Sequence, residues 1–234
     1  MRTTAGVLGG MGPDATVDFM AKVIAATSAE TDQDHVRLLV DQNPAVPSRQ
    51  AALLGDGADP GPVMAAMAVG LRQAGADFLV LPCNTAFAFA PAIRAAVDIP
   101  LVSIIEVTVD ACRGYDTVGV LATAGCLKAG LYQDALTAAG IKPVLPEQEE
   151  VTEIQRLVFR IKNGDQGDDV VSGMQQFAEA LVRRGAKAIV AACTEIPLVL
   201  TQDMLQVPLV ASTDVLARVT AAICTGERPL PDDK

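Results

Sequence analysis

Short apolar runs alternate with amphipathic stretches along most of the chain. Runs such as residues 78–81 and 188–191 are apolar at every position, which is typical of strands covered on both faces. The pattern predicts strands near residues 5–8, 36–40, 78–81, 101–104, 117–121, 187–191 and 208–211. Helical spacing is predicted over residues 13–27, 62–74, 129–139, 147–162, 168–183 and 214–224. This alternation predicts an α/β fold of parallel sheets joined by crossover helices.

Three segments of the first half recur in the second half, in the same order. The offsets are 113, 110 and 108 residues, so the spacing persists as well as the order. A single match would be expected by chance from any strand–helix unit, whereas three in register indicate an internal repeat. The paired segments are 6–12 with 119–125, 74–85 with 184–195, and 99–103 with 207–211.

The repeat predicts two pseudo-symmetric lobes, each a parallel sheet flanked by helices, with the active site in the cleft between them. We place residues 1–100 plus 208–234 in the first lobe and residues 101–207 in the second lobe. Each lobe has about a hundred residues, a normal size for a unit with its own core. Half of the residues are hydrophobic, which is enough to build both cores.

Charge and cysteine usage restrict the partners and the compartment. The net charge of −10 argues against binding nucleic acid through its phosphates, although a local positive cleft can still bind an anionic substrate. No apolar run approaches the roughly 20 residues that span a bilayer. The odd number of cysteines and the lack of a secretory segment fit a reducing compartment. We expect a cytoplasmic protein with a small-molecule substrate and neither nucleic acid nor membrane as a partner.

The repeat delivers a cysteine to the end of one strand in each lobe. Cys83 follows the strand at 78–81, and Cys193 follows the strand at 187–191. Open parallel sheets bind ligands at these strand ends. Two thiols facing each other across a cleft could remove a proton from one face of a carbon and return one to the other. A helix start after each thiol would favour the thiolate, whereas the plain alternative is two small buried hydrophobes.

Other chemistries lack their residues. The five cysteines form no Cys-x-x-Cys pair and His35 is the only imidazole, so we expect no metal site and no Ser/His/Asp hydrolase. No phosphate-binding loop motif is present. The turn at residues 9–12 (GGMG) is either a bare turn or a nest of N–H groups that could hold a carboxylate.

Several polar side chains adjoin these features. The residues after the thiols could bind a ligand or simply cap a helix; they are Asn84, Thr85, Thr194 and Glu195. Arg49 lies in a loop after a strand, where its forked donors could bind a carboxylate. Lys162 ends a predicted helix, where it could serve only to complement the helix dipole.

These residues resemble the aspartate/glutamate racemase family, the cofactor-independent two-cysteine racemases, and within it the aspartate racemase branch. The matching motifs span nearly the whole chain; they include 9–13 (GGMGP), 43–49 (NPAVPSR), 82–86 (PCNTA), 161–164 (IKNG) and 193–198 (CTEIPL). The glutamate racemase branch usually has Asp-Ser-Gly near the N-terminus and Cys-Thr-His at the second thiol, and neither is present here. The resemblance implies an amino acid racemase that acts on aspartate, or on glutamate, and that forms a homodimer.

The resemblance also implies roles for individual residues. Cys83 and Cys193 would be the two acid/base thiols. The residues expected around the substrate α-carboxylate and amine are Asn84, Thr85, Thr123 and Thr194. Arg49 and Lys162 would bind the distal carboxylate. The complete set that we expect to bind substrate is Met11, Gly12, Asn43, Arg49, Asn84, Thr85, Thr123, Lys162, Thr194 and Glu195.

Two departures from the family pattern concern the shape of the substrate pocket. Phe87 stands where a His is often found, and Cys126 stands where a Thr is common. Other interpretations stay open at this point. One is a related enzyme, such as a hydantoin or broad amino acid racemase, a maleate isomerase or a decarboxylase. The other is a two-lobed protein that binds a ligand without turnover.

Overall fold

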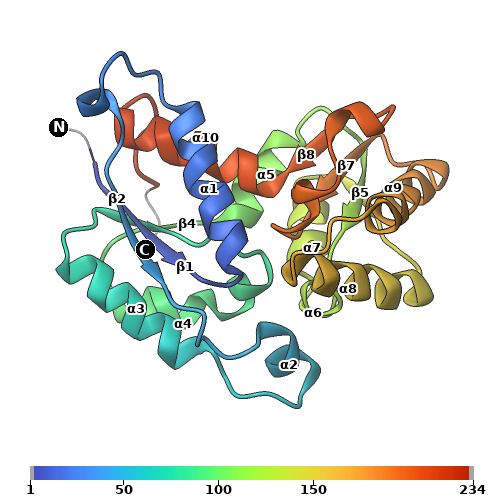
Figure 1. The fold of residues 1–234 in the computed structure, drawn as a ribbon, viewed down its shortest axis with the longest axis horizontal. Coiled ribbons are helices and arrows are strands. Elements are labelled where there is room, and N and C mark those ends of the chain that lie inside the picture. Colours follow the sequence, from blue (N-terminus) through green and yellow to red (C-terminus); the bar gives the residue numbers. More distant parts are fainter. Residues whose placement is uncertain (1–2, 232–234) are drawn as a thin grey trace.

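The computed structural model describes residues 3–231 and contains two parallel four-stranded sheets, one in each lobe (Figure 1). The first sheet has the order β2-β1-β3-β4 and is built from β1 (Ala5–Gly9), β2 (Leu38–Gln42), β3 (Phe78–Val80) and β4 (Leu101–Val102). The second sheet has the order β6-β5-β7-β8 and is built from β5 (Thr117–Leu121), β6 (Lys142–Val144), β7 (Ala188–Ala191) and β8 (Leu209–Ala211). The second order repeats the first, and the predicted two-lobed α/β fold is confirmed.

Helices flank both sheets. They are α1 (Pro13–Ala26), α2 (Arg49–Leu54), α3 (Gly61–Gln73), α4 (Ala90–Ala96), α5 (Ile104–Ala111), α6 (Ala124–Lys128), α7 (Leu131–Ala138), α8 (Gln148–Lys162), α9 (Asp168–Arg183) and α10 (Ser212–Thr225). Figure 1 shows α10 leaving the second sheet and returning across the molecule, where it packs against α1 and α5. The helix α2 extends from the first lobe toward α6 of the second lobe.

The repeat extends to the packing of individual side chains. A Cβ on Gly6 would meet atoms of Leu71, Ala76 and Leu79 at 2.8–3.2 Å. A Cβ on Gly119 would meet the residues 110 positions further along, Leu181, Ala186 and Ile189, at 2.6–3.1 Å. Each glycine lets a helix and the loop after it lie close to the central strand of its sheet. The same close approach therefore places β3 and β7, and the cysteines that follow them, in both lobes.

The strand pairing differs from the predicted lobe boundaries at two points. Residues 101–102 were assigned to the second lobe, but β4 pairs with β3 in the first sheet. Residues 209–211 were assigned to the first lobe, but β8 pairs with β7 in the second sheet. The boundaries were drawn one strand too early, because each edge strand completes the sheet of the segment before it. We propose residues 3–102 plus 212–231 as one lobe and 103–211 as the other; residues 232–234 lie outside the described part.

Some elements were not predicted. β6 contains Pro143 in a three-residue strand, and proline is tolerated there because β6 is the edge of its sheet. The six-residue α2 lies in a segment with no buried position, so it carries no amphipathic signal. Its N-terminus is nevertheless capped in the usual way, since the Ser48 hydroxyl accepts a hydrogen bond from the Ala51 N–H.

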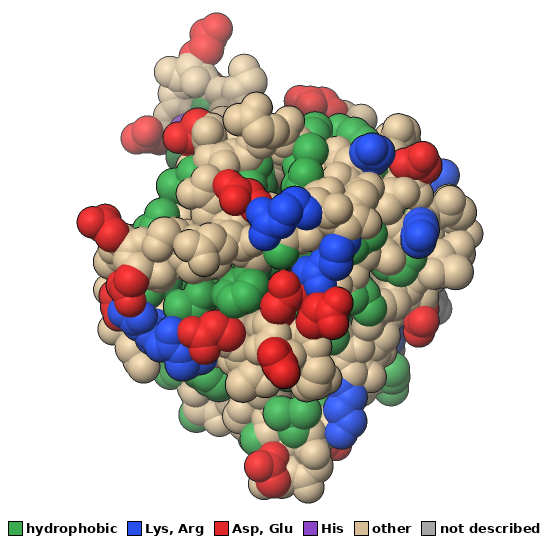
Figure 2. Space-filling view, turned by 90° about the vertical axis from the view of Figure 1, so that its right-hand side faces the viewer, with side chains coloured by type: hydrophobic (Ala, Val, Ile, Leu, Met, Phe, Trp, Pro, Cys, Tyr) green, Lys and Arg blue, Asp and Glu red, His purple; other side chains and the backbone are tan. Residues whose placement is uncertain are grey.

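The outer surface carries charges of both signs. Figure 2 shows basic and acidic side chains interspersed on the face of the second lobe. Within residues 3–231, no helix has the length and apolar character needed to cross a bilayer. In the same part of the chain, no group of three or more His, Cys, Asp or Glu side chains is arranged to hold a metal ion.

Candidate active site

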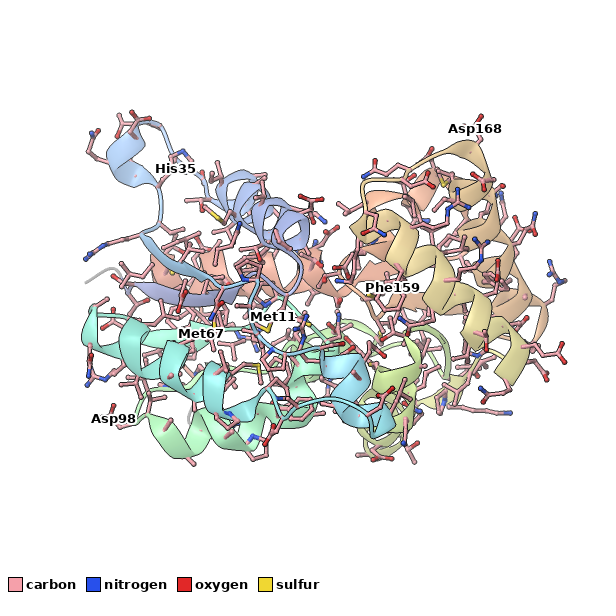
Figure 3. All side chains as sticks on the ribbon, turned by 60° about the horizontal axis from the view of Figure 1, so that its bottom comes forward. Met11, His35, Met67, Asp98, Phe159 and Asp168 are labelled. Carbon is pink, nitrogen blue, oxygen red and sulfur yellow. The ribbon has the colours of Figure 1, made fainter. Side chains whose placement is uncertain are left out.

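A cavity of about 300 Å³ lies between the lobes and is lined by residues from both. Its wall contains both repeat cysteines, Cys83 and Cys193. Figure 3 shows Met11 and Phe159, two further lining residues, on the two sides of this region, and His35 far from it at the outer end of the first lobe. Of the twelve predicted site residues, the cavity brings together Met11, Gly12, Arg49, Cys83, Asn84, Thr85, Thr123, Lys162, Cys193, Thr194 and Glu195. The twelfth, Asn43, is not among its lining residues.

The two thiols occupy equivalent positions but have different neighbours. Each follows a central strand, each is 7% exposed, and each is succeeded by a short 3₁₀ helix, Thr85–Phe89 or Ile196–Leu198. After Cys193 the expected helix start is only one turn of 3₁₀ helix, which provides little of the dipole of a full α-helix, whereas after Cys83 the 3₁₀ helix runs directly into α4.

Cys193 lies in a chain of polar contacts with Glu195 at its centre. The Cys193 thiol donates to Oε2 of Glu195 at 3.0 Å, and the Thr194 hydroxyl donates to the same oxygen at 3.2 Å. The other carboxylate oxygen, Oε1, accepts from the Lys162 ammonium. Gly12 leaves room for this pair, because a Cβ there would lie 3.2 Å from Glu195 Oε1 and 3.3 Å from Lys162 Nζ.

The charges around Cys193 contradict the prediction that its thiolate is favoured. Burial raises the pKa of the Cys193 thiol well above its usual value; the Glu195 charge and hydrogen bond act in the same direction, and Lys162 opposes them. The expected bias toward a thiolate is therefore wrong for Cys193 in this state. Burial by itself lowers the pKa of Lys162, but Glu195 and the two thiols outweigh it and the net pKa is raised.

On the other side of the cavity, Gln50 joins the lobes. Its amide nitrogen donates to the hydroxyls of Thr123 at 2.6 Å and Thr85 at 3.2 Å. Its amide oxygen accepts from the Gly125 N–H at 2.7 Å, and Gln155 accepts from the neighbouring Ala124 N–H at 3.1 Å. The two glutamines therefore occupy the N–H groups at the start of α6, and the Thr85 and Thr123 hydroxyls, 3.1 Å apart, line the cavity. Neither Gln50 nor Gln155 was predicted, because no motif marks a glutamine in a polar segment.

Asn84 is held by a buried network as well as lining the cavity. Its side-chain oxygen accepts from the Tyr132 hydroxyl at 2.6 Å, and its amide donates to Ser212 Oγ at 2.9 Å. Ser212 in turn donates to the Ala191 carbonyl at 2.9 Å. Asn84 therefore ties the end of β3 to the second lobe, with one amide N–H and one oxygen lone pair used within the protein.

The side chains of Arg49 and Asn43 also form hydrogen bonds with backbone groups. Nη1 of Arg49 donates to the carbonyls of Val46 at 3.0 Å and Pro47 at 2.8 Å, and Nη2 donates to that of Met11 at 3.4 Å. Of its five N–H donors, Nε–H and one on Nη2 are left for a ligand. Asn43 accepts from the Ala45 N–H, and its backbone lies where a Cβ on Gly10 would be, so it shapes the turn before Met11.

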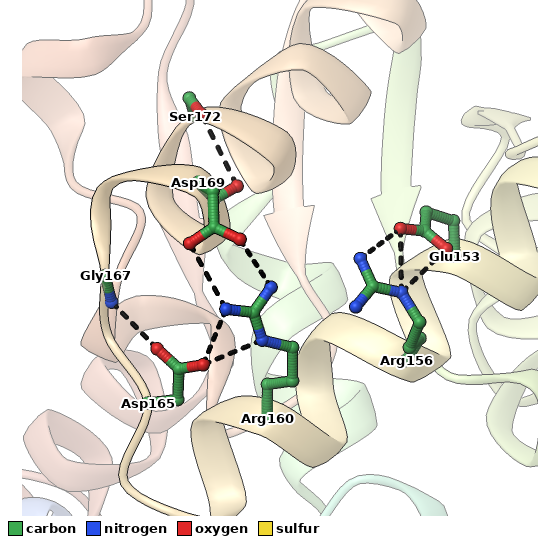
Figure 4. Close-up of polar contacts among 7 residues, drawn as sticks. All are labelled: Glu153, Arg156, Arg160, Asp165, Gly167, Asp169 and Ser172. Carbon is green, nitrogen blue, oxygen red and sulfur yellow. Dashed lines mark hydrogen bonds and ion pairs between the residues drawn. The ribbon is translucent and has the colours of Figure 1, made fainter.

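A surface network anchors the end of α8 that carries Lys162. Arg160 pairs with Asp165 and Asp169, and Asp165 accepts from the Gly167 N–H at 3.1 Å (Figure 4). These contacts fold the loop after Lys162 back onto the start of α9. Arg156 and Glu153 form a separate exposed pair on α8. Exposed pairs stabilise little individually, so the expected effect of the network is to fix the loop geometry.

The remaining three cysteines are buried packing residues. Cys112, Cys126 and Cys224 are at most 1% exposed. Burial raises the pKa of Cys112 and of Cys126 to about 12 and that of Cys224 to about 11. A negative charge on Cys83 would raise the pKa of Cys126 further. Neither Cys126 nor Phe87 lines the cavity, so the two departures from the family pattern lie behind its wall.

Comparisons with known proteins agree with this architecture. The sequence profile of the family described as Asp/Glu/Hydantoin racemase matches residues 8–220. Among curated proteins, the chain is 27% identical over 224 residues to the broad specificity amino-acid racemase RacX of Bacillus subtilis strain 168, covering 93% of this chain and 96% of that protein.

Solved structures give the same result. The aspartate racemase of Picrophilus torridus superposes with a TM-score of 0.85 at 26% identity, covering 98% of this chain and 96% of that one. The glutamate racemase of Francisella tularensis, in complex with D-glutamate, superposes with a TM-score of 0.69 at 17% identity, covering 100% of this chain and 84% of that one. At 17% identity, the similarity to the glutamate racemase shows a shared fold only.

Proposed function

The chain belongs to the Asp/Glu/hydantoin racemase family and is an amino acid racemase, and we propose that it interconverts the L- and D-forms of an acidic amino acid without a cofactor. Aspartate is the first candidate substrate and glutamate the second. The observation that carries the proposal is that Cys83 and Cys193, from equivalent strand ends of the two lobes, line one cavity. We also propose a homodimer in the cytoplasm, as the resemblance and the composition predict.

In the proposed reaction, one cysteine thiolate removes the Cα proton and the opposing thiol protonates the other face. The Cα–H of an amino acid is a much weaker acid than a thiol, whose pKa is about 8.5 in solution, so the site must stabilise the carbanion. Hydroxyl and N–H donors around the α-carboxylate, in a cavity that excludes water, are the means that we propose. Thr85 and Thr123, whose hydroxyls line the cavity, are suited to this role.

The cations that line the cavity support an acidic substrate. Among the described lining residues, the cations are Arg49 and Lys162 and the only carboxylate is Glu195, and the thiolate that the reaction requires supplies a second negative charge. An acidic amino acid carries two carboxylates and one ammonium at neutral pH and therefore a net charge of −1. Since Lys162 is paired with Glu195, Arg49 is the cation that keeps N–H donors for a distal carboxylate, and a neutral amino acid would leave these donors without an anionic partner.

Broad specificity is the second candidate. The similarity to RacX supports it, and so does the Glu195–Lys162 ion pair, which leaves Lys162 less available to a distal carboxylate. An enzyme of this kind would turn over neutral amino acids with efficiencies close to that for aspartate.

A chiral assay over a panel of amino acids in D₂O tests the proposal. We expect L- and D-aspartate to interconvert, with one solvent deuterium appearing at Cα of the product and no CO₂ released. Similar kcat/KM values for several neutral amino acids would replace the acidic assignment with broad specificity. Release of CO₂, or binding of aspartate with no deuterium exchange, would contradict racemisation of aspartate.

A further inference from the structure

Glu195 contacts the reacting group of one lobe and has no counterpart in the other. It is 3% exposed, and both carboxylate oxygens are occupied, one by the Cys193 thiol and Thr194 and the other by Lys162. By the offset of 110, the equivalent residue after Cys83 is Thr85, which carries no charge. The two thiols therefore have matching backbones and different electrostatic neighbours.

The contact between Cys193 and Glu195 requires a proton. A thiol can donate a hydrogen bond to a carboxylate, but a thiolate at 3.0 Å would place two negative charges side by side in a buried site. Lys162 offsets part of this repulsion and is already paired with the other oxygen of Glu195. The geometry consequently favours the protonated form of Cys193.

We propose that Glu195 is a positioning residue that holds Cys193 as the thiol in the resting enzyme, so that Cys193 begins as the acid and Cys83 begins as the base. This inference rests on the proposed two-base function. It assigns Glu195 to the catalytic machinery through Cys193, where the family resemblance placed it only among the substrate-binding residues.

The proton balance of one turnover follows from this assignment. The Cys83 thiolate takes the Cα proton and becomes a thiol, while the carbanion takes the Cys193 proton and leaves a thiolate beside Glu195. Product then departs from an enzyme whose protonation is the reverse of the resting state. Cys193 must recover a proton, and Cys83 must lose one, before the resting form returns. The enantiomer whose Cα–H faces Cys83 is the one that the resting form deprotonates.

The other charged and titratable groups near this pair come from four elements. Lys162 lies at the end of α8, Cys83 follows β3, and Arg49 begins α2; these three line the same cavity. Asp14 of α1 lines an adjoining pocket together with Lys162 and Glu195. Burial, and after it the Glu195 charge, raises the pKa of Cys193, whereas Lys162 lowers it. Removal of Glu195 should therefore lower the pKa of Cys193, and removal of Lys162 should raise it.

Site-resolved alkylation tests the proposal without requiring turnover. The rate of iodoacetamide modification of Cys83 and of Cys193 is measured by peptide mass spectrometry from about pH 6 to about pH 11, a range that brackets an ordinary thiol. For Glu195→Gln we expect Cys193 to react about tenfold faster at a fixed pH below its midpoint. For Lys162→Met we expect it to react about tenfold slower. The larger change should fall on Cys193 in both variants.

Glu153→Gln is the matched control, because it removes the same charge from an exposed position on α8. It should leave both alkylation profiles unchanged. If Glu195→Gln and Lys162→Met both accelerate modification of both cysteines, the pair only closes the cavity and the proposal is overturned. An unchanged Cys193 profile in Glu195→Gln overturns it too. Neither alkylation result bears on the proposed function, which is contradicted only if the enzyme does not racemise its substrate.

Discussion

The two lobes are alike in the sheets that carry the cysteines and different immediately beyond them. Gly6 and Gly119 make the same close packing in their own lobes, with contacts that differ by a constant offset of 110 residues. One residue past each thiol the likeness ends: Asn84 is tied to Tyr132 and Ser212, whereas Thr194 contacts only Glu195 among the hydrogen bonds of the described chain. The duplicated cores place the two thiols in equivalent positions. The residue after Cys83 joins the lobes, whereas the residues after Cys193 set the electrostatic surroundings of that thiol.

Asn84 and Thr194 occupy equivalent positions after the two thiols, and their substitution by alanine should show the largest difference between the lobes in the free energy of unfolding. The first removes the bond from the Tyr132 hydroxyl and the bond to Ser212 Oγ, although Ser212 keeps its bond to the Ala191 carbonyl, and each buried bond that is lost costs about 1–3 kcal/mol. We expect the free energy of unfolding to fall by about 3 kcal/mol for Asn84→Ala and by less than about 1 kcal/mol for Thr194→Ala. Urea unfolding of both variants makes the comparison, and equal losses would mean that Asn84 does not join the lobes.

The glycine pair should behave in the opposite way, with matching effects. Gly6→Ala and Gly119→Ala each force a methyl group against side chains at less than 3 Å. We expect each to lower the free energy of unfolding by about 2 kcal/mol, since overpacking of a core typically costs 1–3 kcal/mol. Urea unfolding is again the measurement. A large loss at one position and none at the other would show that the packing of the lobes is not equivalent.

The fold was predictable because three paired segments recur in order and the central strands are apolar at every position, whereas the edge strands and the site contacts were not. β4 and β8 were placed in the wrong lobes, because an edge strand of two or three residues looks the same whichever sheet it joins. β6 was missed because Pro143 interrupts its apolar pattern. The motifs predicted residues that line the cavity, but Gln50 and Gln155 bind residues far away in the sequence, Gln50 across the lobes and Gln155 within the second lobe, and no local spacing encodes such contacts.

A smaller effect should appear in the pH dependence of stability around Cys126. Burial raises the pKa of this thiol from 9.0 to about 12, so the folded state retains a proton that the unfolded state loses. This contribution to stability is complete below about pH 9 and declines as the pH rises toward 12, by at most about 1.4 kcal/mol per pH unit. Cys126→Ala should flatten the alkaline decline measured by urea unfolding between pH 8 and pH 10, both about one unit from an ordinary thiol pKa. An identical decline in the variant would contradict the shift.

The smallest expected effect on stability concerns the contact of Gln50 across the lobes. Gln50→Ala removes bonds to Thr85, Thr123 and Gly125 at a half-buried position, and we expect a loss of about 1 kcal/mol. Because Thr85 and Thr123 are the proposed donors to the substrate, we also expect KM to change more than kcat. Steady-state kinetics on aspartate would check this, with Gln148→Ala at the start of α8 as a control away from the cavity. A variant with unchanged KM would remove Gln50 from the binding site.

The central claim is that two thiols act on opposite faces of one Cα, and racemisation by the single variants Cys83→Ala and Cys193→Ala tests it most directly. Because each thiol supplies a proton transfer that the other cannot, we predict that kcat in both directions falls at least about a thousandfold in either variant, with the fold retained. Circular dichroism would verify the fold, and Cys112→Ala should leave kcat near that of the wild type. Racemisation at the wild-type rate by either cavity variant would contradict the account.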